Sequence, residues 1–134
     1  MPTDIRAAIV QAALNAQQQA YARYSQFRVG AALLAADGQI FTGCNVENAS
    51  YGLTICAERA AVFAAIAAGQ QRFELLAIAT RGGAAPCGAC RQVLFEFAPN
   101  LPILLIDSDQ PSRIAEFNLR DLLPGAFVGS SIVK

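Results

Sequence analysis

The spacing of apolar and polar positions along the chain predicts short buried strands separated by helices. A first helix runs from residue 3 or 4 to about residue 22, because its apolar positions recur every three or four residues. Asp37-Gly38 predicts a tight hairpin turn, and Gly69 ends an alanine-rich helix. The expected strands cover residues 27–35, 39–44, 73–80, 102–106 and 113–117, and the later helices cover residues 56–68, 87–98 and 119–123.

The order of these elements predicts a single α/β domain over residues 1–134. From residue 39 onward, strand, helix, strand, helix and strand follow one another, which requires parallel strands joined by right-handed crossovers. Only a tight turn at residues 107–111 separates the last two strands. The fifth strand must therefore return antiparallel, since a parallel return needs a crossover of a dozen or so residues.

The composition changes this picture by indicating an assembly. Hydrophobic residues make up 54% of the chain and charged residues only 15%, so a lone domain would expose apolar patches. The formal net charge is zero, which gives no general attraction to nucleic acid. The apolar runs are too short or too interrupted to span a membrane, and no secretory signal peptide is visible. We therefore expect a cytoplasmic protein that forms oligomers.

The cysteines are the candidates for metal chemistry, because the chain has four of them and no histidine. In a reducing compartment, a C-x-x-C pair is more typical of a metal site than of a disulfide. Cys87 and Cys90 form such a pair at the start of one predicted helix, and Cys56 starts another. Thiolates are favoured at helix N-termini, so all three could bind one ion. A zinc ion with three protein ligands keeps its fourth position for water.

The residues next to these cysteines suit a hydrolytic site. Glu58 lies two positions after Cys56, within plausible reach of the water, and in a chain without histidine it is the best candidate for the general base. Three thiolates leave the zinc centre negatively charged, which makes its water less acidic. Arg59 and Arg91 are candidates for donating hydrogen bonds to the sulfur atoms and offsetting this charge.

Residues 56–59 (CAER) and 86–92 (PCGACRQ) resemble the zinc signature of the cytidine deaminases, in the homotetrameric branch that uses three cysteines. Three further stretches are similar to family sequences in the same order: residues 27–32 (FRVGAA), 43–48 (GCNVEN) and 122–127 (LLPGAF). The resemblance covers nearly the whole chain, from about residue 21 to residue 127.

The resemblance implies a zinc hydrolase of pyrimidine salvage that converts cytidine and 2′-deoxycytidine to the uridine nucleosides and ammonia. In the family mechanism, zinc activates a water, the residue matching Glu58 takes its proton, and the hydroxide attacks C4 of the ring. The same glutamate passes protons to N3 and to the leaving amine. The implied fold is a three-layer α/β/α domain with a mixed five-stranded sheet of order 2-1-3-4-5.

The resemblance also assigns residues to the substrate. Asn45 and Glu47 alternate with Val46 and so can face one side, where the family uses Asn-x-Glu to bind the ribose. It places Phe27 at the pyrimidine and the backbone at Ala57 and Cys87 beside the polar groups of the ring. Tyr51 and Phe127 match residues that relatives lend to the pocket of a neighbouring subunit, which implies a homotetramer with shared active sites.

The segment before Phe27 departs from the family. Relatives read Tyr-x-Pro-Tyr-Ser-Lys/Arg, whereas residues 21–26 read YARYSQ. Without the proline this connector should be less rigid, and without the basic residue it carries less positive charge.

Three other functions remain open. A deaminase of an aminonucleoside antibiotic such as blasticidin S would share the zinc motifs, although Phe27, Asn45 and Glu47 favour plain nucleosides. A zinc-stabilised binding module without catalysis would need Cys44 as a fourth ligand. A deaminase acting on RNA or DNA is disfavoured by the zero net charge and by the antiparallel hairpin at residues 107–117.

Overall fold

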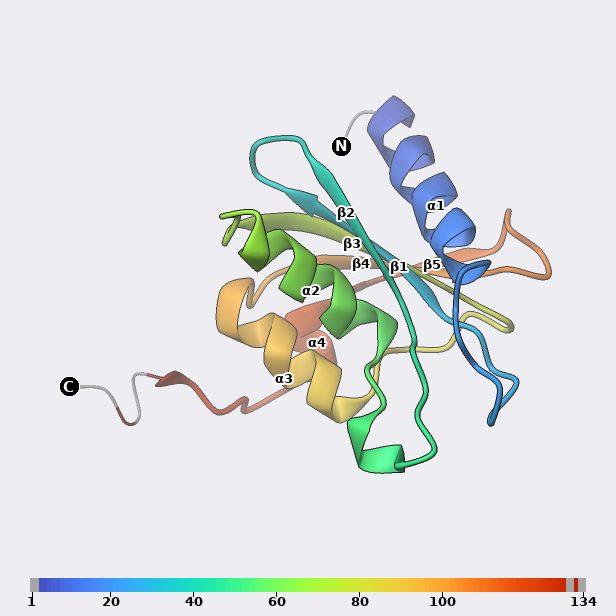
Figure 1. The fold of residues 1–134 in the computed structure, drawn as a ribbon. Coiled ribbons are helices and arrows are strands. Elements are labelled where there is room, and N and C mark those ends of the chain that lie inside the picture. The colour runs from blue at the N-terminus through green and yellow to red at the C-terminus, as the bar shows by residue number, and fades with distance from the viewer. Residues whose placement is uncertain (1–2, 130–131, 133–134) are drawn as a thin grey trace.

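A five-stranded sheet forms the middle layer of the fold (Figure 1). The computed structural model describes residues 3–129 and residue 132. The strand order is β2-β1-β3-β4-β5, in which β3 and β4 are parallel and every other neighbouring pair is antiparallel. This confirms the expected mixed sheet and the antiparallel last strand. The strands are β1 (Gly30–Ala35), β2 (Ile40–Cys44), β3 (Phe73–Thr80), β4 (Pro102–Asp107) and β5 (Ile114–Asn118).

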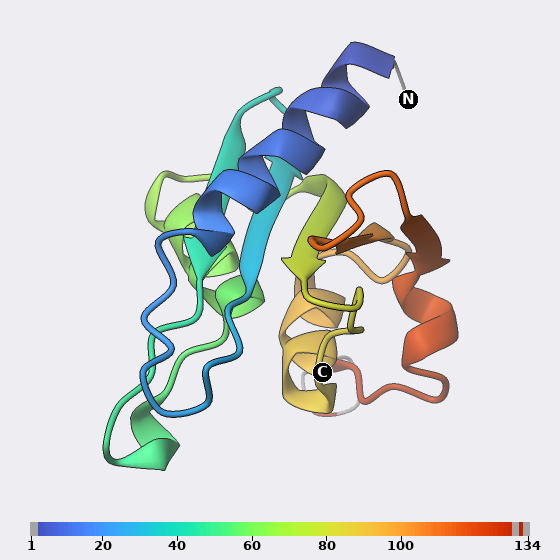
Figure 2. The same cartoon turned by 90° about the vertical axis from the view of Figure 1, so that its right-hand side faces the viewer.

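Helices cover both faces of the sheet and complete the three layers. The α1 helix (Thr3–Gln17) lies on one face, and α2 (Ala57–Ala67) and α3 (Gly88–Phe97) lie on the other (Figures 1 and 2). A 3₁₀ turn, η1 (Tyr51–Leu53), precedes α2, and the short α4 (Leu119–Leu122) follows β5. None of the helices in the described part of the chain is long and apolar enough to cross a membrane.

The central strands are apolar throughout because each of their faces contributes to a core. In β1, Ala31 and Leu33 pack with α2 and α3, whereas Ala32 and Leu34 pack with α1. Successive side chains of a strand point to opposite faces, so a strand covered on both sides has no position for a polar residue. The uninterrupted apolar runs in the sequence follow from this burial.

Two predicted boundaries were wrong at the segment that joins α1 to β1. The first helix ends at Gln17 rather than near residue 22, because the chain tightens into i→i−3 turns and then pairs Tyr21 with Val46. The strand expected from Phe27 begins only at Gly30. Residues 18–29 instead form an irregular connector that runs beside the loop at residues 45–55 (Figure 2).

Close packing of helix backbone on the sheet depends on two glycines. A Cβ atom at Gly30 would lie 2.2 Å from the carbonyl oxygen of Ala13 in α1. A Cβ atom at Gly43 would lie 2.4 Å from the carbonyl oxygen of Ala57 and 2.5 Å from the backbone nitrogen of Ala61, both in α2. Any side chain at these positions would push a helix away from the sheet.

We predict that Gly43→Ala lowers the free energy of unfolding by about 1–3 kcal/mol, because the added methyl group displaces α2. Thermal unfolding of the zinc-loaded protein measures this. Gly52→Ala is the matched control, since a Cβ atom there meets nothing within 4 Å. Equal melting temperatures of the two variants would show that α2 is not in contact with Gly43.

Candidate active site

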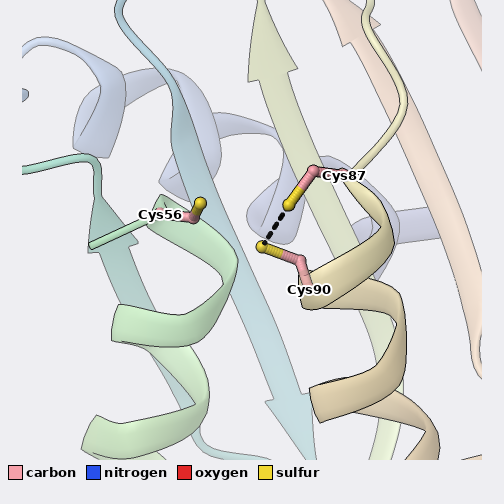
Figure 3. A group of neighbouring side chains, drawn as sticks. All are labelled: Cys56, Cys87 and Cys90. Carbon is pink, nitrogen blue, oxygen red and sulfur yellow. Dashed lines mark hydrogen bonds between the residues drawn. The ribbon is translucent and has the colours of Figure 1, made fainter. Parts of the chain in front are cut away.

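Three cysteine side chains converge at the starts of α2 and α3 (Figure 3). Cys56 is the N-cap residue of α2 and Cys87 that of α3, and neither side chain forms a capping hydrogen bond. Cys90 lies in the first turn of α3 and is fully buried. The three Sγ atoms lie within 4.8 Å of one another, and those of Cys87 and Cys90 are 3.3 Å apart.

The sheet places these two helix starts together. Both β2 and β3 are antiparallel to β1, so they run in the same direction and end at the same edge of the sheet. The chain that leaves each strand leads into a helix on the same face, α2 after β2 and α3 after β3. Cys56 and Cys87 are 31 positions apart in the sequence, and the shared direction of β2 and β3 brings them together from two different helices.

The sulfur atoms fit a zinc ion. Thiolates bind Zn²⁺ at about 2.3 Å in a tetrahedral arrangement, which sets sulfur–sulfur distances of roughly 3.8 Å. The Sγ atoms of Cys87 and Cys90 are 3.3 Å apart and no pair is separated by more than 4.8 Å, so binding requires only small side-chain movements. Among the described residues, this group of possible ligands contains Cys56, Cys87 and Cys90 but not Cys44. Three protein ligands are typical of catalytic zinc, whereas a closed structural site has four.

Glu58 is a buried carboxyl group beside the cysteines. It lies in the first turn of α2 and is only 5% exposed. Burial raises the pKa of Glu58, against the opposing effects of its own backbone N–H, the Cys90 thiol and the Arg59 charge. A carboxyl group with a raised pKa is suited to taking up a proton and returning it.

The thiols respond differently to the same surroundings. Burial raises the pKa of Cys90, and the charge of Glu58 adds to the effect. Burial also acts to raise the pKa of Cys87, but hydrogen bonds from the backbone and thiol of Cys90 outweigh it and lower that pKa overall. A divalent cation bound between them would favour the thiolate form of each.

The two arginines have different partners. Arg59 donates from Nη2 to the Sγ atom of Cys56 at 3.3 Å, and this bond raises the pKa of Arg59. Arg91 donates from Nε to the carbonyl oxygen of Pro86 at 2.8 Å and from Nη1 to that of Leu122 at 2.7 Å. Arg59 therefore contacts a sulfur atom as the sequence suggested, whereas the hydrogen bonds of Arg91 connect the start of α3 to the end of α4.

The side chain of Asn45 holds the connector in place. Its Oδ1 accepts from the N–H of Val29 and its Nδ2 donates to the carbonyl oxygen of Phe27, both at 2.9 Å. Asn45 is only 8% exposed, and one hydrogen of its amide group remains beyond these two bonds. Phe27, by contrast, keeps a partly exposed ring.

Glu47 is held by the other half of the connector. Its Oε1 accepts from the backbone N–H groups of Tyr24 and Ser25 at 2.9 and 3.1 Å, and its Oε2 accepts from the Ser25 hydroxyl. The Ser25 hydroxyl contributes most to lowering the pKa of Glu47. With Tyr51 and Thr54, these residues line a hollow of about 320 Å³, near the lower end of the volumes of small-molecule pockets. Sequence reasoning missed Ser25, since no spacing pattern connects it to Glu47.

The remaining candidates differ in how far they are buried. Ala57 is fully buried between Cys56 and Glu58. Tyr51 is 77% exposed at the rim of the hollow, and Phe127 is 58% exposed, with its carbonyl oxygen accepting from Nε2 of Gln92 at 3.0 Å.

Comparison with known proteins identifies the family. Residues 4–104 match the family model described as the cytidine and deoxycytidylate deaminase zinc-binding region. The chain belongs to this deaminase family. It is 49% identical over 116 residues to the cytidine deaminase of Sporosarcina psychrophila, covering 84% of each chain. It is 50% identical over 117 residues to that of Mycobacterium tuberculosis, covering 86% of this chain and 84% of the relative.

A solved member of the deaminase family has the same fold. The crystal structure of cytidine deaminase from Burkholderia pseudomallei is 47% identical to this chain and matches it with a TM-score of 0.85. The match covers 95% of this chain and 100% of that one. The fold expected from the sequence is therefore that of the family. The matching family model describes a zinc-binding region, as the cysteine spacing predicted.

We predict that the purified protein contains about one zinc ion per chain, and that Cys44→Ser keeps it, because Cys44 lies outside the sulfur group. Cys87→Ser should lose most of the zinc. Atomic absorption on the two dialysed variants measures this. Metal loss in Cys44→Ser would contradict a three-ligand site and favour a closed structural one.

Proposed function

We propose that the chain hydrolyses cytidine and 2′-deoxycytidine to uridine and 2′-deoxyuridine, with release of ammonia. The observation that carries this proposal is the buried Glu58 beside three convergent thiols. Cys56, Cys87 and Cys90 would hold zinc, which supplies Lewis-acid activation of water when bound. One water enters and one ammonia leaves, so the reaction needs no oxidant or other co-reactant.

Glu58 is the proton carrier in this proposal. It takes a proton from the attacking water and passes protons to N3 of the ring and to the amine that leaves C4. Burial raises the pKa of Glu58, which supports this role. A carboxyl group that both accepts and donates a proton works best when its pKa is closer to the working pH. The backbone at Ala57 and Cys87 would flank the polar groups of the ring.

Arg59 offsets the charge of the thiolates in this proposal, which its hydrogen bond to Cys56 supports. Arg91 contributes in another way. Its bonds to the carbonyl oxygens of Pro86 and Leu122 support a bracing role, in which it fixes the loop that leads to Cys87.

The connector and its neighbouring loop form the sugar side of the proposed site. Glu47 lines the hollow and Asn45 keeps one unused amide hydrogen, so together they offer an acceptor and a donor to a sugar hydroxyl. The exposed ring of Phe27 can pack on the pyrimidine. These residues favour plain nucleosides over an aminonucleoside such as blasticidin S.

We further propose a homotetramer in which neighbouring subunits complete each site. Tyr51 is exposed at the rim of the hollow beside Glu47, and Phe63 is exposed on the outer face of α2. Phe127 is exposed next to Phe95 and Glu96, in the second half of α3. Burial of such residues between subunits would remove apolar surface from water. Free thiols at the metal site support a reducing compartment, the cytoplasm, and the family implies a place in pyrimidine salvage.

A direct substrate comparison tests the proposal. Purified protein is incubated with cytidine, 2′-deoxycytidine, cytosine, CMP and blasticidin S, and the loss of cytosine absorbance is followed. Rapid turnover of the two nucleosides and slow turnover of the other compounds is the expected result. Preference for blasticidin S would identify an antibiotic deaminase instead, and no turnover at all would favour a structural zinc module.

We predict that Glu58→Gln binds zinc and folds normally but loses at least about 100-fold in kcat, because an amide cannot take up the proton. Zinc content and thermal unfolding provide the controls. Turnover within a few-fold of the wild-type rate would show that another group is the base.

We predict that Phe127→Ala raises KM more than it alters zinc content, because it removes one wall of a neighbour's site. In hybrids, a Glu58→Gln chain contributes an intact Phe127 and a Phe127→Ala chain contributes an intact Glu58. In mixed tetramers, the activity per chain that carries Glu58 should therefore be higher than in tetramers of Phe127→Ala alone. Hybrids without any gain would place Phe127 in the site of its own subunit, and sedimentation as a fully active monomer would contradict sharing altogether.

A further inference from the structure

The hydroxyl of Ser25 lies between Glu47 and the backbone of Phe27, at the wall of the hollow. Its Oγ accepts a hydrogen bond from the N–H of Phe27 at 3.0 Å. Because a backbone N–H can only donate, the single hydrogen of the hydroxyl is free for Glu47. The direction of the Ser25–Glu47 bond is therefore fixed: serine donates and the carboxylate accepts.

The hydrogen bonds within the described structure leave one acceptor position of the Glu47 carboxylate unoccupied. A carboxylate has about four acceptor positions, two on each oxygen. The N–H groups of Tyr24 and Ser25 occupy both positions on Oε1, and the Ser25 hydroxyl occupies one on Oε2. In the described structure, one position on Oε2 thus remains, on a side chain that lines the hollow.

We infer that Ser25 is a positioning residue, which turns the carboxylate of Glu47 so that its last acceptor position receives a hydroxyl hydrogen from the sugar of the substrate. This inference rests on the proposed function, in which Glu47 contacts the sugar. Without the Ser25 hydroxyl, Oε2 would have no donor among residues 3–129, and the carboxylate could rotate about its broad terminal torsion. The substrate would then have to order this group on binding.

The arrangement also determines what Glu47 can recognise. Three donors stabilise its ionised form, and the Ser25 hydroxyl is the largest contributor to its lowered pKa. An ionised carboxylate only accepts hydrogen bonds, so the vacant position selects a group that donates, such as a hydroxyl. The hydroxyl of Thr54, which also lines the hollow, accepts from the N–H of Asn48 at 3.2 Å and so forms part of the loop.

The test compares Ser25→Ala with Ser112→Ala, an exposed serine far along the chain with no role in the site. Substrates are cytidine and 2′,3′-dideoxycytidine, which lacks the two ring hydroxyls. For Ser25→Ala we expect KM for cytidine to rise about 10-fold or more, as for loss of a hydrogen bond to a charged group, with kcat little changed. We expect kcat/KM for dideoxycytidine to change less than about twofold. Ser25→Thr keeps the hydroxyl and should restore the KM for cytidine.

A double-mutant cycle with Glu47→Gln separates positioning from a general effect on folding. If Ser25 acts through Glu47, the KM of the double variant should exceed that of Glu47→Gln by less than about twofold. The inference would be overturned if Ser25→Ala lowered kcat/KM equally for cytidine and dideoxycytidine. It would also be overturned if Ser25→Ala had the same effect in the wild-type and Glu47→Gln backgrounds. A Glu47→Gln variant with unaltered use of cytidine would overturn it as well.

Zinc content and melting temperature are measured for every variant. If Ser25→Ala does not fold, Ser25→Cys takes its place, because a thiol has a similar size but is a weak donor. Failure of the wild-type protein to deaminate cytidine would refute the proposed function itself. An active wild-type enzyme without coupling between Ser25 and Glu47 would refute only the inference.

Discussion

The shared direction of β2 and β3 is the constraint on which the site depends. Because β1 lies antiparallel between them, both strands end at the same edge, and the helices that follow begin there. Cys56 and Cys87 occupy the two N-cap positions, where their side chains are free to point at each other instead of capping. Glycine at position 43 then lets α2 lie directly on β2. A small shift of either helix would separate the sulfur atoms.

The metal centre concentrates negative charge in a largely apolar interior. Three thiolates and the carboxylate of Glu58 would be too costly to bury together without compensation. Bound zinc and Arg59 would together offset three of these four charges, and in the proposed reaction the remaining one can be protonated. The same burial that makes Glu58 costly raises its pKa and prepares it for proton transfer.

The side of the site that we propose for the sugar is organised differently, by hydrogen bonds within the chain. Asn45 and Glu47 use most of their capacity on the connector at residues 18–29, which has no regular structure of its own. The connector has Arg23 at the position where the family has a proline. The hydrogen bonds restrain the backbone of the connector, as the ring of a proline would help to do. Polar groups fixed in this way before the substrate arrives lose little entropy when it binds.

The sequence alone determined most of the strands and helices and singled out Cys56, Cys87 and Cys90 as one group, because periodicity, turn residues and motif spacing can be read directly along the chain. It did not determine where α1 ends or β1 begins, since the pairing of Tyr21 with Val46 overrides helical spacing there. Nor could it show that Arg91 binds backbone rather than sulfur, or that Ser25 holds Glu47. The bonds from Arg91 to Leu122 and from Ser25 to Glu47 join residues more than 20 positions apart, and only the tertiary structure decides which distant groups meet.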